Sequence, residues 1–225
     1  MNFFYGINNE IFKSELQIPL FQNKSNLPSK LKLFKCFPKN SKWILKDLSN
    51  CKINEYFYFL KNEDIFNEDV FFLCDEKKID NFNDQKLLNL DTFTDTFPAF
   101  RANLKIYINK GGFSSYQSEY PFSMVTNKGT ILSSISSLGN QDADKNYLLI
   151  KNIFQEPIKK KFNAYLVNHF TKKIEEKYEL TTNSVNCIEI NNKFLKPEIF
   201  FVTQKYLGVP MYASIKNKFL SLNTH

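Results

Sequence analysis

Apolar residues occur in short runs along the first part of the chain, and few of these runs have helical spacing. Residues 56–60 and 70–74 are two such runs, separated by segments rich in Asn, Asp and Glu. Runs that are apolar throughout indicate strands covered on both faces. We therefore expect a small α/β or α+β domain over residues 1–97. Two short helices are expected within it, one capped by Ser41 and one at residues 84–88.

The pattern changes at residue 98, where turn-forming residues begin to recur about every 8–12 positions, the spacing of sandwiches and barrels. Between them lie short apolar runs that we interpret as strands at 104–108, 122–125, 147–150, 187–190, 199–202 and 211–215. The sequence thus predicts a mainly β protein. Its C-terminal part, residues 98–225, is expected to be an antiparallel β-sandwich of immunoglobulin-like or jelly-roll-like type.

Residues 157–179 fit two patterns. Apolar residues three and four positions apart suit an amphipathic helix, whereas the alternation of Phe162, Ala164 and Leu166 suits a strand. A helix would place three lysines at its N-terminal end and three glutamates at its C-terminal end, which opposes the helix dipole. We therefore predict a hairpin turning near residues 168–171. A second hairpin is expected at the C-terminus, with its turn at 216–218 and a return strand at 219–222.

Charge divides the chain in the same place. The formal net charge is +7, and 29 of the 30 cationic residues are lysines, Arg101 being the exception. Residues 1–52 hold nine lysines against three acids, residues 53–97 four against eleven, and residues 98–225 seventeen cations against nine. The basic C-terminal part can therefore dock on the acidic segment 53–97, within one molecule or by self-association of two.

Composition also limits the classes of function. The excess of Lys, Asn, Phe and Ile is typical of a low-GC genome, so the high pI is weak support for nucleic acid, which we do not expect as a partner. No apolar run is long enough for a membrane span and no secretory signal is recognisable, so we expect a cytoplasmic protein. No cofactor or metal is expected, because the chain has two histidines and no paired cysteine motif. The cysteines, which we expect to be reduced, are Cys36, Cys51, Cys74 and Cys187.

Two neighbouring stretches carry the candidate binding residues. Arg101 lies among small residues, and its planar guanidinium suits a carboxylate, phosphate or sulfate group. The stretch 111–121 combines hydroxyl, amide, carboxylate and aromatic groups, which suit a sugar or another polar ligand. Its candidate ligand-binding residues are Tyr116, Gln117, Glu119 and Tyr120. The alternative interpretations are an internal ion pair of Arg101 with Glu119 or Asp95, and a polar edge strand.

These observations favour a non-catalytic or accessory module that binds a saccharide or an anionic small molecule. No nucleophile elbow and no glycine-rich phosphate loop occurs in the sequence, so an enzyme is not the leading hypothesis. The catalytic alternative is a carbohydrate-active enzyme that uses Glu119 together with Asp142 or Asp144, because glycoside hydrolysis needs two carboxyl groups. A structural or assembly protein without a small-molecule ligand is the other alternative.

Overall fold

The computed structural model describes residues 2–20, 31–54, 56–87, 102–109, 111–126 and 128–224. Within these ranges the chain is mainly β, with antiparallel strand pairing, as predicted. The described helical segments are short: α1 (Phe122–Thr126) and the 3₁₀ turns η1 (Ser49–Cys51), η2 (Asn62–Asp64), η3 (Ile79–Asn81) and η4 (Asn192–Phe194).

Three sheets are built mostly from the first half of the chain. The five-stranded sheet contains, in spatial order, β5 (Lys52–Asn54), β6 (Phe57–Leu60), β2 (Phe12–Pro19), β8 (Asn103–Ile108) and β9 (Phe113–Gln117). The three-stranded sheet contains β4 (Lys42–Asp47), β3 (Leu31–Lys39) and β7 (Val70–Asp75). A two-stranded sheet joins β1 (Asn2–Phe3) and β10 (Tyr120–Pro121).

The second half of the chain forms two four-stranded sheets. The first contains, in spatial order, β11 (Leu132–Ser134), β16 (Ile199–Thr203), β13 (Lys161–Asn168) and β14 (Ile174–Thr181). The second contains β15 (Ser184–Ile190), β12 (Lys145–Asn152), β17 (Val209–Lys216) and β18 (Phe219–Thr224).

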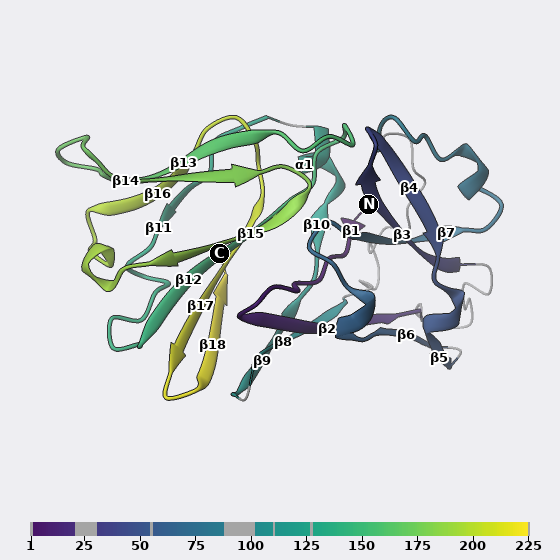
Figure 1. Ribbon diagram of the computed structural model, residues 1–225, viewed down its shortest axis with the longest axis horizontal. Coiled ribbons are helices and arrows are strands. Elements are labelled where there is room, and N and C mark those ends of the chain that lie inside the picture. The colour runs from purple at the N-terminus through teal and green to yellow at the C-terminus, as the bar shows by residue number, and fades with distance from the viewer. Residues whose placement is uncertain are drawn as a thin grey trace, which may run out of the picture.

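The four larger sheets are arranged around the middle of the molecule like the blades of a four-bladed propeller, with β1 and β10 near the centre (Figure 1). This differs from the predicted sandwich preceded by a separate mixed domain. The reason is visible in β12, whose residues alternate between two hydrophobic cores. Tyr147 and Leu149 enter one core, and Leu148 and Ile150 enter the other. A sheet covered on both faces packs against two neighbours.

The prediction of two short helices before residue 98 is wrong. Residues 42–47 form β4, which pairs with β3 along its length, and Trp43 is buried with its indole N–H donating to the Gln155 carbonyl. Residues 84–85 form a turn and residues 86–87 are not helical, while residue 88 lies outside the described residues. No α-helix occurs in the described part of residues 1–97, so the mixed α/β character is not shown there. The border near residue 98 stays a prediction, although β8 pairs directly with β2.

Both predicted hairpins are confirmed. Strands β13 and β14 pair antiparallel, and Phe162, Ala164 and Leu166 are buried on one face of β13, as the alternation indicated. Strands β17 and β18 are joined by a two-residue turn in which Asn217 (φ 49°) and Lys218 (φ 68°) are both left-handed. Positive φ at both turn positions is the geometry that matches the twist of a tight hairpin.

The acidic segment 53–97 contacts the basic C-terminal part, although most of its ion pairs among the described residues, those of Asp69, Glu76 and Asp84, are with lysines of residues 1–52. The Lys159 ammonium lies 2.7 Å from the Glu68 carboxylate. The buried Lys151 Nζ donates to the carbonyl oxygens of Asn67 (2.7 Å) and Asp69 (2.9 Å). Self-association stays a prediction.

Across the described ranges, no helix combines the length and apolar character needed to cross a bilayer.

The buried position of Lys151 gives a testable pH dependence. Burial lowers the pKa of Lys151 from its ordinary 10.5 to about 8. Between pH 8 and 10.5 the unfolded chain therefore holds a proton on Lys151 that the folded chain has released, so this residue makes stability rise with pH. Urea titration measures the free energy of unfolding of wild type and of Lys151→Met. As the pH rises from 8 to 10.5, we expect the wild type to gain stability relative to Lys151→Met. A difference that stays constant from pH 7.5 to 10 would contradict the assignment.

Candidate functional site

The structure brings three of the sequence-predicted residues together at the end of β9, an edge strand of the five-stranded sheet. Tyr116 and Gln117 are its last residues, and Glu119 follows in the short loop before β10. Ser118 fixes this loop to the N-terminal segment, because its hydroxyl accepts from the Tyr5 N–H (2.7 Å) and donates to the Tyr5 carbonyl (2.5 Å). Arg101 lies outside the described residues.

Tyr120, the remaining predicted site residue, lies in the core. Its side chain is fully buried, and its hydroxyl donates to the Ile153 carbonyl at 3.1 Å. Burial raises the pKa of the Tyr120 phenol, which the Ile153 hydrogen bond lowers in part. This tyrosine holds β10 in place and does not reach the surface on which Gln117 is exposed.

Two clefts flank the end of β9. The first, here called the β9 cleft, has a volume of about 470 Å³, and its lining residues are Ala102, Asn103, Ser115, Tyr116 and Gln117. The second has a volume of about 340 Å³, and its lining residues are Tyr116, Gln117, Glu119, Pro121, Met124, Gly208, Val209 and Pro210. Tyr116 and Gln117 therefore separate the two clefts and line both.

Strand register determines which side chains face the β9 cleft. Leu104 and Ile106 of β8 are buried, so the residues between them face outward. Gln17 is opposite Asn103 in the β2–β8 pair, and Asn103 is opposite Gln117 in the β8–β9 pair. Directly opposed residues lie on the same face of a sheet. Three amide side chains thus form a row across the outer face.

The same outer face carries exposed aromatic and charged groups. Phe113, two positions before Ser115 on β9, has 63% of its surface exposed. The Lys105 ammonium lies 4.9 Å from the centre of the Phe113 ring and 3.2 Å from the Glu15 carboxylate. Its charge is thus paired with that of Glu15, and the residues that line the β9 cleft are themselves uncharged.

Sequence reasoning missed Gln17, Asn103, Phe113 and Ser115, although a local signal for two of them was present. Residues 12–18 alternate with Phe12, Leu16 and Ile18 on the buried face, a two-residue period that places Gln17 outward. The period of residues 103–108 places Asn103 outward in the same way. Gln17 and Asn103 are adjacent because β2 pairs with β8. These two strands are about 90 positions apart in the chain, and no local sequence pattern indicates that they pair.

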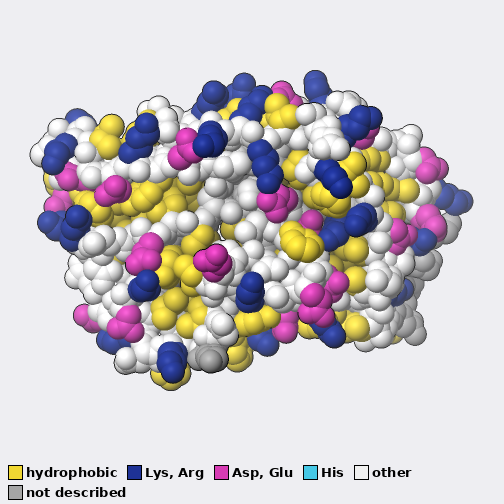
Figure 2. All heavy atoms as spheres, viewed as in Figure 1, with side chains coloured by type: hydrophobic (Ala, Val, Ile, Leu, Met, Phe, Trp, Pro, Cys, Tyr) yellow, Lys and Arg dark blue, Asp and Glu magenta, His cyan; other side chains and the backbone are white. Residues whose placement is uncertain are grey.

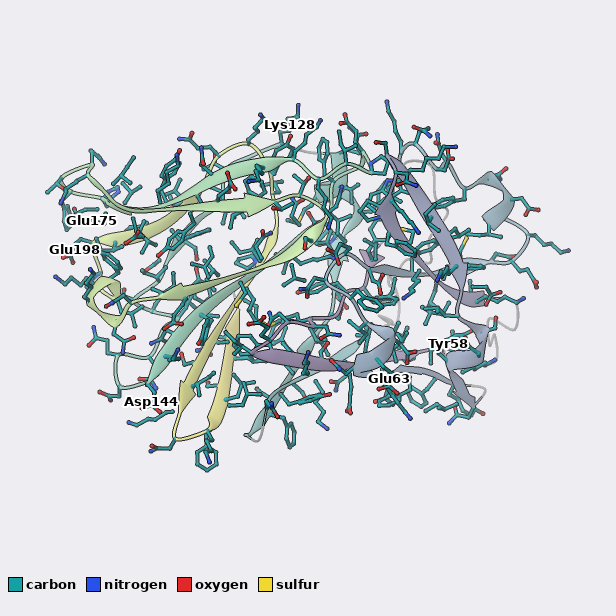
Figure 3. The ribbon with its side chains drawn as sticks, in the orientation of Figure 1. Tyr58, Glu63, Lys128, Asp144, Glu175 and Glu198 are labelled. Carbon is teal, nitrogen blue, oxygen red and sulfur yellow. The ribbon has the colours of Figure 1, made fainter. Side chains whose placement is uncertain are left out.

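The catalytic alternative pairs Glu119 with Asp142 or Asp144, and the structure carries these residues on different segments. The cleft beside Glu119 reaches Pro210, at the start of β17, whereas the Asp144 N–H donates to Ile215 near the other end of that strand. Pro210 and Ile215 are five residues apart, which is about 17 Å along an antiparallel strand, and paired glycosidase carboxylates are roughly 5–10 Å apart. Figure 3 shows Asp144 at the lower edge of the molecule, and Asp142 belongs to the same loop. The catalytic alternative stays a prediction.

The described residues contain no group of three or more histidine, cysteine, aspartate or glutamate side chains that could hold a metal ion. No protein-family model, curated protein or solved structure matches the chain.

Proposed function

We propose that this protein is a non-catalytic binding module that holds a saccharide in the β9 cleft. The observation that carries the proposal is the row of amide side chains formed by Gln17, Asn103 and Gln117. A planar amide offers two donors and an acceptor, which suit neighbouring hydroxyl groups of a sugar ring. The Phe113 ring, exposed on the same face as Gln117, offers a surface for the apolar face of the sugar ring.

The charge around the β9 cleft supports a neutral ligand over an anionic one. Lys105 is paired with Glu15, and the lining residues Asn103, Ser115 and Gln117 are uncharged. The cleft is large enough for a saccharide residue and is open, as a site that binds part of a longer glycan needs to be. The described side chains therefore do not favour an anionic ligand in this cleft.

Glycan binding and two single substitutions test this proposal. We expect the protein to bind a subset of glycans on an array, and the best one to be confirmed by calorimetric titration. Asn103→Ala and Gln117→Ala should each weaken binding about tenfold, because each leaves sugar hydroxyls without a partner. Gln204→Ala removes an exposed amide outside the clefts and serves as the matched control. Absence of glycan binding, or affinities that do not change in either cleft variant, would contradict the proposal.

A further inference from the structure

A separate cavity of about 280 Å³ lies on the three-stranded sheet, and four lysines line it. We call it the lysine pocket and define it by Lys35, Phe37, Lys39, Lys46, Phe66 and Lys159. Lys35, Phe37 and Lys39 alternate along β3 and therefore share one face, on which Lys46 of β4 is directly opposite Lys35. Figure 2 shows lysine side chains beside exposed hydrophobic ones over β3 and β4.

Acidic residues neutralise only part of the charge in this pocket. Lys35 forms a 2.9 Å ion pair with Asp69, and Lys159 forms a 2.7 Å ion pair with Glu68. Lys39 and Lys46 form no ion pair with a described residue. The four lysines and two acids of the lining thus carry a formal charge of +2. The buried Lys151, hydrogen-bonded to the Asp69 carbonyl, adds positive charge beneath it.

This concentration of lysines is unfavourable for the empty protein. Like charges directly opposed in a strand pair are destabilising, and Lys35 and Lys46 are such a pair. A bound dianion would remove the repulsion and use ammonium groups that the fold already holds close together. Lysine commonly binds phosphate as a point charge, and a phosphate dianion matches the formal +2 of the lining.

Aromatic rings line the pocket as well. Phe66 has 56% of its surface exposed, and the Lys35 ammonium lies 5.3 Å from the centre of its ring. The Lys46 ammonium lies 5.6 Å from the centre of the Phe37 ring. These contacts place ammonium groups beside apolar surface, so a ligand that contacts both needs a phosphate and a flat apolar part.

We infer that the lysine pocket binds a small phosphorylated molecule with an aromatic ring, at a site distinct from the β9 cleft. Phosphate oxygens contact Lys39 and Lys46, which have no acidic partner among the described residues, and the ring lies against Phe66. Inorganic phosphate lacks the ring and an uncharged aromatic compound lacks the phosphate, so each makes only part of these contacts.

The test uses 1-naphthyl phosphate as the probe, with inorganic phosphate and 1-naphthol as its two halves. We expect 1-naphthyl phosphate to bind at least tenfold more tightly than either half, and added salt to weaken its binding. If 1-naphthol bound as tightly as 1-naphthyl phosphate, the pocket would be a merely apolar surface. If inorganic phosphate bound as tightly as 1-naphthyl phosphate, the pocket would be a merely basic surface. Either result would overturn the inference.

Two double variants of equal charge test the location of this site. Lys39→Gln/Lys46→Gln should weaken binding of 1-naphthyl phosphate at least tenfold, whereas Lys177→Gln/Lys216→Gln, on exposed strand positions elsewhere, should change it less than twofold. Similar melting temperatures would show that both variants fold. The same affinity in both would overturn the inference. Gln117→Ala should retain 1-naphthyl phosphate binding, so failure at the β9 cleft and failure at the lysine pocket are distinguishable.

Discussion

Deleting residues 219–225 is expected to abolish the folded state, because it removes the whole of β18. This strand makes six residue pairs with β17 and buries Leu220. Its turn also contacts the five-stranded sheet, where the Gly112 N–H donates to the Lys218 carbonyl at 2.6 Å. Loss of a strand and its apolar contacts is comparable with the total stability of a domain, about 5–15 kcal/mol. Circular dichroism and sedimentation of the truncated chain measure the effect.

A chain that ends at Leu222 is the control for this deletion. It keeps Leu220 and four of the six pairs with β17. It loses the 3.1 Å hydrogen bond from Asn223 to the Leu138 carbonyl, worth about 1 kcal/mol. We expect this chain to unfold cooperatively at a slightly lower temperature. A chain ending at Lys218 that unfolds with the same cooperativity would show that β18 is dispensable.

Local pattern was sufficient for hairpins and insufficient for the arrangement of sheets. The β13–β14 hairpin was predictable because a helix over Lys159–Lys161 and the following glutamates would have opposed its own dipole. By contrast, Trp43 and its neighbours form a run too short to separate strand from helix. Pairing with β3 decides their conformation, together with the bond from Trp43 to the Gln155 carbonyl, 112 positions away.

The candidate sites show the same limit. Tyr116, Gln117 and Glu119 are brought together because they are consecutive or nearly so, and any conformation of the loop keeps them close. Nearness in sequence does not determine burial, and Tyr120, one residue further, is a core residue. The lysine pocket was missed because it depends on the register of β3 with β4 and on the approach of Lys159 from a distant segment.

The ion pair between Lys35 and Asp69 accounts for the second large effect that we expect. The side chains are 10% and 2% exposed, and Asp69 also accepts from the Phe66 N–H at 3.0 Å. Asp69→Asn keeps the shape and an acceptor for this N–H but leaves the buried Lys35 ammonium without its counter-charge. Breaking one partner of a buried pair costs about 3–5 kcal/mol. Urea titration should therefore show a loss of about 3 kcal/mol, the lower end, because Lys35 borders an open pocket.

Two further variants separate the ion pair from general effects of charge. Asp84→Asn breaks the exposed pair with Lys42 and should leave the unfolding midpoint unchanged. Burial raises the pKa of the Asp69 carboxyl although the Lys35 ammonium lowers it, so the pair does not fully offset the cost of burying the charge. Lys35→Met/Asp69→Asn removes both charges and should recover most of the stability lost in Asp69→Asn alone. If the double variant were the less stable of the two, the loss in Asp69→Asn would come from packing rather than from an uncompensated charge.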